Sequence, residues 1–309
     1  MNTVRIKSYA KVNLTLEITG RESGYHLLDS LVASVDIFDL IVLKKRKDKL
    51  SSVRMHGLGS ESISPENNNA LKAAELFSQT FGTFGADITV YKNIPMGAGL
   101  GGSSADASGV LKGMAKLYGI TDETALGALA DRLGSDTKYM LRGGFARMQG
   151  RGDKLTPLSC DGQLHFFMIF PPSSVATAAC YGEYDREPVR AGEEKATEKA
   201  IAALLEKDVN GVGRYLTNDL FAPAARLNTD VQKALEEASA FSPLGVVMTG
   251  SGSCVLALFE TRELCEWAKS RYRGKFRTAV CKTIVPTEQK TWKNPFALSS
   301  EEIAETERN

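Results

Sequence analysis

The chain carries one stretch in which glycines crowd together, Pro95-Met96-Gly97-Ala98-Gly99-Leu100-Gly101-Gly102-Ser103-Ser104-Ala105-Asp106. Four of six consecutive positions are glycine, and two hydroxyl side chains follow them. Glycine tolerates positive φ and has no Cβ, so successive N–H groups can converge on an anion. The pattern indicates a loop whose backbone closely approaches a ligand, and phosphate is the ligand that it favours.

The residues on either side of the loop fit the same interpretation. Residues 88–91 have the composition of a short strand, and apolar residues recur at helical spacing from Ala107 to Tyr118, before Gly119. The loop would then lie at a helix N-terminus, where unpaired N–H groups and the helix dipole attract negative charge. We therefore predict an anion-binding strand, loop and helix.

This loop can be compared with two known phosphate-binding motifs and with a structural turn that binds no ligand. The P-loop pattern needs a lysine before its Ser/Thr, which Ser103-Ser104 does not supply. Gly97, Gly99 and Gly102 match the dinucleotide pattern G-x-G-x-x-G, but the acidic residue expected about 20 residues on is not at a strand end. A structural turn without a ligand stays open on the loop alone.

The composition is that of a globular protein with room for two domains of ordinary size. The chain has 309 residues, 43% hydrophobic and 24% charged. Its 38 basic and 37 acidic residues give a net charge of +1, which makes no case for a nucleic-acid or membrane surface. We expect a small-molecule partner chosen by a local site, and both a monomer and a homodimer stay open.

Cysteines and histidines argue against a protein-held transition metal. The five cysteines form no C-x-x-C pair, and the three histidines lie far apart. This usage fits reduced thiols in a cytoplasmic protein. The sequence also lacks an apolar signal region and any run of about 18 apolar residues, so we expect a cytoplasmic location.

Before the loop, residues 10–18 alternate in polarity. This pattern predicts a strand with one buried face, and it puts Lys11 and Asn13 side by side on the other face. The long apolar run over residues 31–43 predicts two strands or one bent strand. Asn67-Asn68-Asn69 can cap a helix over residues 70–81.

After the loop, a helical pattern over residues 124–133 ends at Gly134, and on local grounds Asp136 is the N-cap of a short helix over residues 137–141. A second α+β region then begins near Asp161 and contains another glycine loop, Thr249-Gly250-Ser251-Gly252-Ser253-Cys254. The expected strands and helices of this region are 164–170, 197–205, 230–241, 246–248, 255–259, 262–271 and 277–285. We predict domains over residues 1–160 and 161–287 and a polar tail over residues 288–309.

Three segments resemble the signature motifs of the GHMP kinases, the family of galactokinase, homoserine kinase, mevalonate kinase and phosphomevalonate kinase. They are Ala10-Lys11-Val12-Asn13-Leu14, residues 95–105 and residues 249–254, in the family's order and at fitting separations. The resemblance implies an α+β protein with a ribosomal-protein-S5-like N-terminal domain and a ferredoxin-like C-terminal domain. It also implies an active site between the two domains.

Further segments are similar to the branch of the family that phosphorylates a cytidine diphosphate-linked methylerythritol in the non-mevalonate isoprenoid route. These segments are Gly20-Arg21, Gly24-Tyr25-His26, Gly134-Ser135-Asp136, residues 150–157, residues 171–181 and Asn218-Asp219-Leu220. One departure stands next to the aspartate, because Thr137-Lys138 replaces the usual Val-Pro. The aspartate itself is kept.

The resemblance implies roles in transfer of a phosphoryl group from ATP. Asp136 would be the general base, and Lys11 would keep it ionised and steady the transferring group. Mg²⁺ would come with ATP, near Ser103 or Ser104. The triphosphate would be bound by Pro95, Gly97, Gly99, Leu100, Gly101, Gly102, Ser103 and Ser104.

For the acceptor, the resemblance implies that Tyr25 and Tyr181 stack on cytosine while His26 hydrogen-bonds its edge. The remaining substrate contacts would be Asn13 and Thr177 at the methylerythritol, Gly250 and Ser251 at phosphate, and either Arg147 or Arg151 at the diphosphate. Two other functions stay open: a kinase of another small alcohol, such as mevalonate or homoserine, and an inactive nucleotide-binding homologue. A hydride-transfer enzyme is the least favoured.

Overall fold

The computed structural model describes residues 2–57, 64, 68–187 and 195–284. Its N-terminal half is built around one eight-stranded sheet that receives one short strand from the second half of the chain. The elements of this half, in order, are β1 (Thr3–Asn13), β2 (Thr15–Glu22), β3 (Tyr25–Lys45), β4 (Ser52–His56), α1 (Asn69–Phe81), β5 (Ala86–Tyr91), α2 (Gly102–Tyr118), α3 (Glu123–Leu133), α4 (Ser135–Arg142), β6 (Phe145–Gly150) and β7 (Lys154–Leu158).

The C-terminal half has a four-stranded antiparallel sheet in the order β10-β11-β8-β12. Its elements are β8 (His165–Phe170), α5 (Thr177–Arg186), α6 (Ala196–Leu205), α7 (Val209–Arg214), β9 (Thr217–Asn218), α8 (Phe221–Leu227), α9 (Thr229–Ser239), β10 (Gly245–Met248), β11 (Val255–Phe259), α10 (Arg262–Arg271) and β12 (Arg277–Lys282). The predicted α+β class is confirmed.

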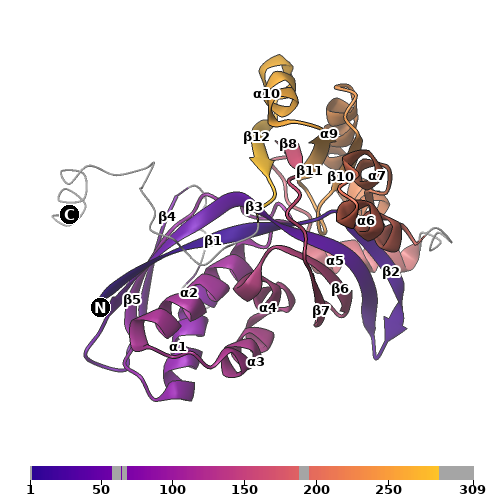
Figure 1. Cartoon of the computed structure of the whole chain (residues 1–309). Helices are drawn as coiled ribbons and strands as arrows, with labels where there is room; N and C mark the ends of the chain where they lie inside the picture. Colours follow the sequence, from indigo (N-terminus) through magenta and orange to yellow (C-terminus); the bar gives the residue numbers. More distant parts are fainter. Residues whose placement is uncertain (1, 58–63, 65–67, 188–194, 285–309) are drawn as a thin grey trace.

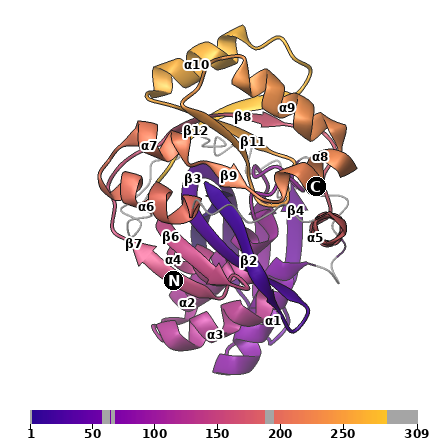
Figure 2. The same ribbon diagram turned by 90° about the vertical axis from the view of Figure 1, so that its right-hand side faces the viewer.

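The two halves stack face to face, in the order helices, large sheet, C-terminal sheet and helices (Figures 1 and 2). Helices α1 to α4 lie on one side of the large sheet, and the C-terminal sheet lies on the other with α9 and α10 beyond it (Figures 1 and 2). The strands of the C-terminal sheet explain this order. Phe166 and Met168 of β8 pack toward the large sheet, whereas Phe167 and Ile169 pack with α9 and α10, as expected for alternating residues of a strand buried on both faces.

The central strand of the large sheet is β3, a single strand of 21 residues. It pairs with β1, β2, β5 and β6, so one strand runs through the whole layer. The predicted alternative of two strands over residues 31–43 is therefore wrong. The pairing of β1 with β3 shifts register between Tyr9 and Lys11, which accommodates the bend.

The predicted strand over residues 10–18 is divided at Leu14 into β1 and β2, and it is buried on both faces. Lys11 and Asn13, expected on an open face, are only 6% and 3% exposed. The glycine loop packs against the Lys11 side chain, since a Cβ on Gly101 would lie 3.3 Å from its Cγ, and the Lys11 N–H donates to the Leu100 carbonyl oxygen at 3.1 Å. Burial of a charged side chain requires partners, and these lie in the site described below.

Most helices begin and end where the sequence predicts. Asn68 caps α1 by accepting from the Ala70 N–H, and Gly119 ends α2 in the left-handed conformation. The short elements α7, β9 and α8 were not predicted. The predicted tail, residues 288–309, lies outside the described residues, and the domain boundary at residue 160 stays a prediction.

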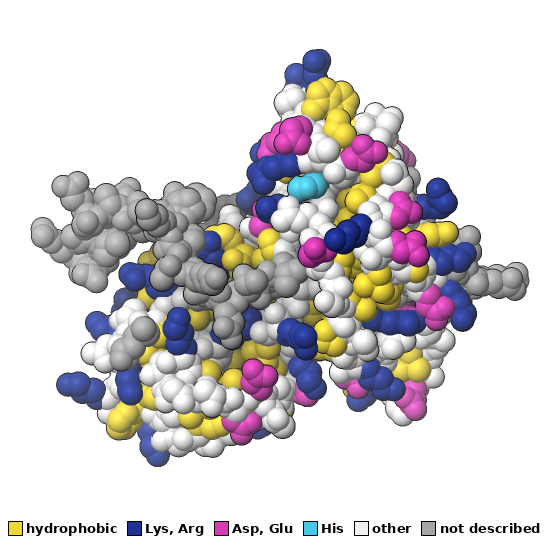
Figure 3. All heavy atoms as spheres, viewed as in Figure 1, with side chains coloured by type: hydrophobic (Ala, Val, Ile, Leu, Met, Phe, Trp, Pro, Cys, Tyr) yellow, Lys and Arg dark blue, Asp and Glu magenta, His cyan; other side chains and the backbone are white. Residues whose placement is uncertain are grey.

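On the face seen in Figure 3, cationic and anionic side chains are interspersed. None of the helices in the described ranges is long and apolar enough to cross a membrane.

Candidate active site

One cleft of about 970 Å³ brings the predicted site residues together between the two halves. Its lining includes all of them: Lys11, Asn13, Tyr25, His26, Pro95, Gly97, Gly99, Leu100, Gly101, Gly102, Ser103, Ser104, Asp136, Thr177, Tyr181, Gly250 and Ser251. Arg151 also lines this cleft, whereas Arg147 lies in a separate cavity. Residues from seven separate segments of the chain thus meet at one surface.

The glycine loop needs glycine for both its conformation and its close contacts. Gly99 and Gly101 have φ of +76° and +70°. A Cβ on Gly99 would lie 2.2 Å from the Thr249 carbonyl oxygen, and one on Gly101 would lie 2.4 Å from Cε of Met140. The loop is therefore wedged between the second glycine loop and α4.

The loop ends at the N-terminus of α2, and this end is open to a ligand. Gly101 is its N-cap residue, and no side chain of the described chain caps it. The first-turn N–H groups and the helix dipole can therefore serve an anion in the cleft. This geometry suits the phosphate binding that the sequence predicts for the loop.

The two glycine loops, far apart in the sequence, contact one another directly. The Cys254 N–H of the second loop donates to the Ala98 carbonyl of the first at 3.3 Å. The second loop also contacts β1, because the Asn13 N–H donates to Oγ1 of Thr249 at 2.8 Å. Asn218 holds the second loop in place, because its Nδ2 donates to the carbonyls of Met248 and Gly250 at 2.6 and 2.8 Å. Asn218 was quoted above as part of a motif, but the sequence did not predict that its side chain supports the second glycine loop.

Lys11 and Asp136 form an ion pair at the floor of the cleft. Nζ of Lys11 lies 3.3 Å from Oδ2 of Asp136 and donates to Oδ1 of Asn13 at 2.6 Å. Nδ2 of Asn13 in turn donates to Oγ of Ser30 at 2.8 Å. The ammonium is thus fixed between an amide oxygen and a carboxylate.

Asp136 lies inside α4, and its predicted place as an N-cap is wrong. Gly134 is the N-cap residue, so Asp136 belongs to the first turn of the helix. At the departure, Thr137 is fully buried, with no hydrogen-bond partner for its Oγ1 among the described residues, and Nζ of Lys138 pairs with Asp131 of α3 at 2.8 Å. The first turn is also where a helix dipole favours a carboxylate.

The aromatic side chains stand at the other end of the cleft. The His26 ring stacks on Tyr181, with ring centroids 4.7 Å apart and an interplanar angle of 24°. Tyr25 is 59% exposed, and the Arg151 guanidinium lies 4.5 Å from the centre of its ring. Burial raises the pKa of Tyr181, which keeps its hydroxyl neutral. One face of the Tyr181 ring is thus covered by His26, and one face of the Tyr25 ring by Arg151.

Thr177 and Ser251 join the start of α5 to the second glycine loop. Their hydroxyl oxygens lie 3.0 Å apart. This contact puts two hydroxyls and the backbone of Gly250 on one wall of the cleft. Such a wall can present donors to a polar or anionic group.

The sequence did not predict a buried ionic cluster of Lys92, Asp39 and Asp106 beside the glycine loop. Nζ of Lys92 contacts Oδ2 of Asp106 at 2.7 Å and also the carboxylate of Asp39, which accepts from the N–H groups of Asn93 and Ile94. Burial raises the pKa of Asp106 to about 8, against the opposing charge of Lys92. One signal was present, because a charge at Asp39 within an apolar run implies a buried partner.

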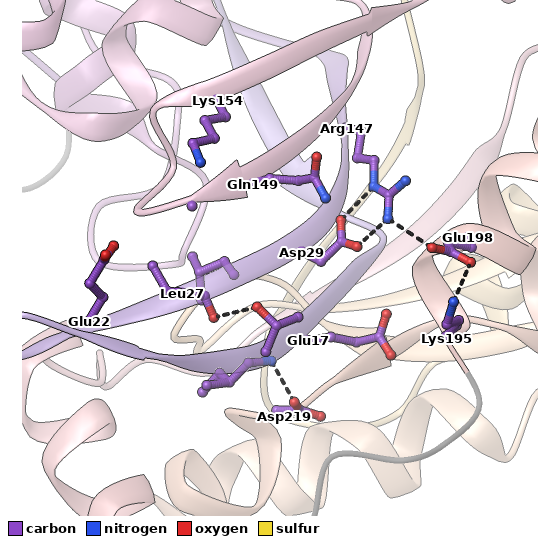
Figure 4. A pocket seen from close by; sticks show the side chains of 14 residues that line it. Glu17, Glu22, Leu27, Asp29, Arg147, Gln149, Lys154, Lys195, Glu198 and Asp219 are labelled. Carbon is purple, nitrogen blue, oxygen red and sulfur yellow. Dashed lines mark hydrogen bonds and ion pairs between the residues drawn. The ribbon is translucent and has the colours of Figure 1, made fainter.

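A second cavity, of about 520 Å³, lies between the β2–β3 hairpin, β6 and the start of α6 (Figure 4). Arg147 is held there by Asp29, with Nε 2.8 Å from Oδ1, and by Glu198 at 3.4 Å. The ion pairs direct this guanidinium toward α6 and away from the main cleft.

Comparison with known proteins matches both halves of the chain. Residues 68–146 match the model of the GHMP kinases N terminal domain, and residues 200–276 match that of the GHMP kinases C terminal domain. The fold is that of an ATP-dependent small-molecule kinase. The chain belongs to the GHMP kinase family.

Several relatives cover most of the chain. A 4-diphosphocytidyl-2-C-methyl-D-erythritol kinase from Clostridium beijerinckii is 34% identical over 89% of this chain and 99% of its own length. The enzyme of that name from Acaryochloris marina is 35% identical over 86% of this chain and 90% of its own length. The predicted family is confirmed.

Solved structures agree with this assignment. A crystal structure of a 4-(cytidine 5'-diphospho)-2C-methyl-D-erythritol kinase has a TM-score of 0.75 and 31% identity over 90% of this chain and 98% of that one. A homoserine kinase from Cytophaga hutchinsonii has a TM-score of 0.74 at 19% identity, over 92% of this chain and 95% of that one, and shares the fold. The predicted two-domain architecture of the family is confirmed.

Proposed function

We propose that the protein transfers the γ-phosphoryl group of ATP to the 2-hydroxyl of 4-diphosphocytidyl-2-C-methyl-D-erythritol, giving the 2-phosphate. The observation that carries the proposal is the Lys11–Asp136 pair, which shares one cleft with the glycine loop and with Tyr25, His26 and Tyr181. The names of the relatives support the same substrate. The product would enter the non-mevalonate route to isoprenoid precursors.

At the donor end, the glycine loop and the start of α2 would bind the triphosphate. The hydroxyls of Ser103 and Ser104 are neutral oxygen ligands of the kind that Mg²⁺ accepts beside substrate phosphates, so these residues fit Mg²⁺ carried by ATP. Mg²⁺ would neutralise charge on the phosphates. Nδ2 of Asn69 donates to Oγ of Ser103 at 2.9 Å and would orient that hydroxyl.

At the reacting centre, Asp136 would act as the general base. The 2-hydroxyl gives its proton to the Asp136 carboxylate as its oxygen attacks the γ-phosphorus, the bond to the bridging oxygen breaks, and ADP leaves. The Lys11 ammonium, 3.3 Å from Asp136, would offset negative charge that develops on the transferring group.

At the acceptor end, cytosine would lie between Tyr25 and Tyr181 with His26 at its edge. Asn13 and Thr177 would hold the methylerythritol, and the N–H groups of Gly250 and Ser251 would meet phosphate. For the diphosphate we propose Arg151, because it lines the cleft, whereas Arg147 is held by Asp29 and Glu198.

The cell compartment is part of the proposal. The five cysteines are free of disulfides, and ATP is the donor, so we place the reaction in the cytoplasm, carried out by a monomer or a homodimer.

The test is ADP release by the purified protein with Mg-ATP and a panel of acceptors. We expect turnover with the cytidine diphosphate-linked methylerythritol, and a large rise in KM when Tyr25 or Tyr181 is replaced by Ala. Turnover with mevalonate or homoserine alone would instead indicate another kinase of the family. ATP binding without turnover of any acceptor would indicate an inactive homologue.

A further inference from the structure

Asp185, at the end of α5, makes two charge-assisted contacts at the rim of the cleft. Its Oδ1 lies 2.7 Å from Nε2 of His26, and its Oδ2 lies 3.2 Å from Nη1 of Arg21. All three residues line the main cleft. The His26 ring is 12% exposed and is further held by its stack on Tyr181. The imidazole is therefore fixed in orientation.

The contact with Asp185 decides which ring nitrogen of His26 carries a proton. A carboxylate can only accept hydrogen bonds, so Nε2 must donate. In the neutral imidazole, Nδ1 is then an acceptor. Within the described residues, no group hydrogen-bonds Nδ1 of His26. A base that hydrogen-bonds Nδ1 of this ring therefore meets an acceptor.

This acceptor distinguishes the two pyrimidines. Cytosine presents an exocyclic amine that donates a hydrogen bond, whereas uracil has a carbonyl oxygen at that position. We infer that Asp185 is a positioning residue that fixes the His26 tautomer and thereby makes the site prefer cytosine over uracil. The inference rests on the proposed function, because it takes a pyrimidine nucleotide as the ligand beside His26.

Replacing Asp185 by Asn should reverse the polarity of His26. Arg21 has only donors, so it requires the amide oxygen of the new side chain. The amide NH₂ then faces Nε2, which must accept, and the proton moves to Nδ1. The exocyclic amine of cytosine would then face the N–H donor at Nδ1, whereas the carbonyl oxygen of uracil could accept a hydrogen bond from it.

The experiment compares kcat/KM for the cytidine- and uridine-linked forms of the methylerythritol diphosphate. We expect the wild-type protein to prefer the cytidine form, and Asp185→Asn to lower that preference by roughly tenfold to a hundredfold, the cost of one mismatched hydrogen bond. The change should appear in KM, since the reacting Lys11–Asp136 pair is untouched. Equal use of both forms by the wild type, or an unchanged ratio in Asp185→Asn, would overturn the inference.

Two further variants separate this effect from general damage to α5. Glu183→Gln removes another carboxylate of α5, one that pairs with Arg226 at 2.9 Å, and should leave the ratio unchanged. Arg21→Ala combined with Asp185→Asn frees the amide oxygen to accept from Nε2, so the preference for the cytidine form should return. A double variant that keeps the ratio of Asp185→Asn contradicts the mechanism.

The tautomer can also be read without any substrate. ¹⁵N NMR of the imidazole nitrogens should report a proton on Nε2 of His26 in the wild type and on Nδ1 in Asp185→Asn, with His26→Gln assigning the signals. If the wild type fails to phosphorylate the cytidine-linked acceptor, the proposed function and the base preference fall together. The NMR result then still decides whether Asp185 sets the tautomer.

Discussion

Lys11 is a charged side chain that the fold buries almost completely, and its environment explains how. An unpaired ammonium at that depth would cost several kcal/mol. The Asn13 amide oxygen and the Asp136 carboxylate provide the compensating partners. The two ends of this contact come from β1 and α4, so the position of the pair depends on the packing of those elements.

Asp136→Asn tests the general base. We expect kcat to fall by about 10²-fold or more, because an amide cannot take the hydroxyl proton, while the KM for ATP changes little. Steady-state ADP release measures both constants. Asp131→Asn removes the carboxylate that pairs with Lys138 and should leave kcat within twofold. A kcat of Asp136→Asn within tenfold of wild type contradicts the assigned role.

Gly99→Ala tests the close contact of the two glycine loops. The new Cβ would lie 2.2 Å from the Thr249 carbonyl oxygen, on a residue with φ of +76°. Gly119→Ala is the matched control, because Gly119 has φ of +71° with no atom within 4 Å of its Cβ position. We expect about 1 kcal/mol of destabilisation for Gly119→Ala and at least ~2 kcal/mol for Gly99→Ala in urea unfolding. Equal losses would show that the clash relaxes freely.

At the scale of elements, α6 shows how a helix start can be stabilised from a distant strand. Its N-cap residue, Lys195, gives no side-chain cap. The side chain of Glu17 in β2 caps the helix instead, because it accepts from the N–H groups of Ala196 and Thr197 at 3.1 and 2.8 Å. Figure 4 shows Glu17 in the cavity between the hairpin and α6. The carboxylate also complements the helix dipole.

Glu17→Ala should therefore destabilise the protein by about 1–2 kcal/mol, the usual cost of a lost N-terminal cap. Urea unfolding followed by circular dichroism measures the change. Glu22→Ala, in the same strand and beside the same cavity, is the control and should cost less than about 0.5 kcal/mol, since Glu22 is exposed. Equal effects of the two substitutions would argue against the cap.

Elements with their own caps and periodicity could be predicted from the sequence. The helix α10 follows the predicted range of 262–271, and α1 begins beside its predicted asparagine cap. The two residues of β9 carry no local signal, because that strand exists only by pairing with β2. Asp136 was placed one step outside its helix, since Gly134 already supplies the N-cap position.

The candidate site divides in the same way. The motif segments supplied the catalytic, ATP-binding and acceptor residues named above, and these residues line one cleft. The contacts of Lys92 and of Asp185 each join side chains from three separate segments of the chain, and no spacing in the sequence brings those segments together. Their roles could be found only from the folded chain.

At the scale of the whole molecule, the two halves share one apolar core. A single buried cluster contains Val12 and Leu31 of the large sheet together with Phe166 and Leu256 of the C-terminal sheet. Backbone pairing also crosses between the halves, at β2 with β9 and at Val35 with Thr283. Neither half can bury its inner face without the other.

We therefore expect the protein to unfold in one cooperative transition. Scanning calorimetry should give a ratio of calorimetric to van't Hoff enthalpy close to one, because the shared cluster couples both halves. A fragment of residues 1–160 should show little resistance to proteolysis at a temperature where the full chain resists. Two resolved transitions, or a stably folded fragment, would contradict this expectation.

The pairing of β2 with β9 also has a consequence for how the protein is made. Ile18 donates its N–H to the side chain of Asp219, a residue 201 positions later in the chain. During synthesis on the ribosome, β2 and the inner face of the large sheet emerge long before their partners exist. Apolar surface of this kind on a nascent chain invites aggregation. We therefore expect the first half of the chain to be prone to aggregation until the last strands have left the ribosome.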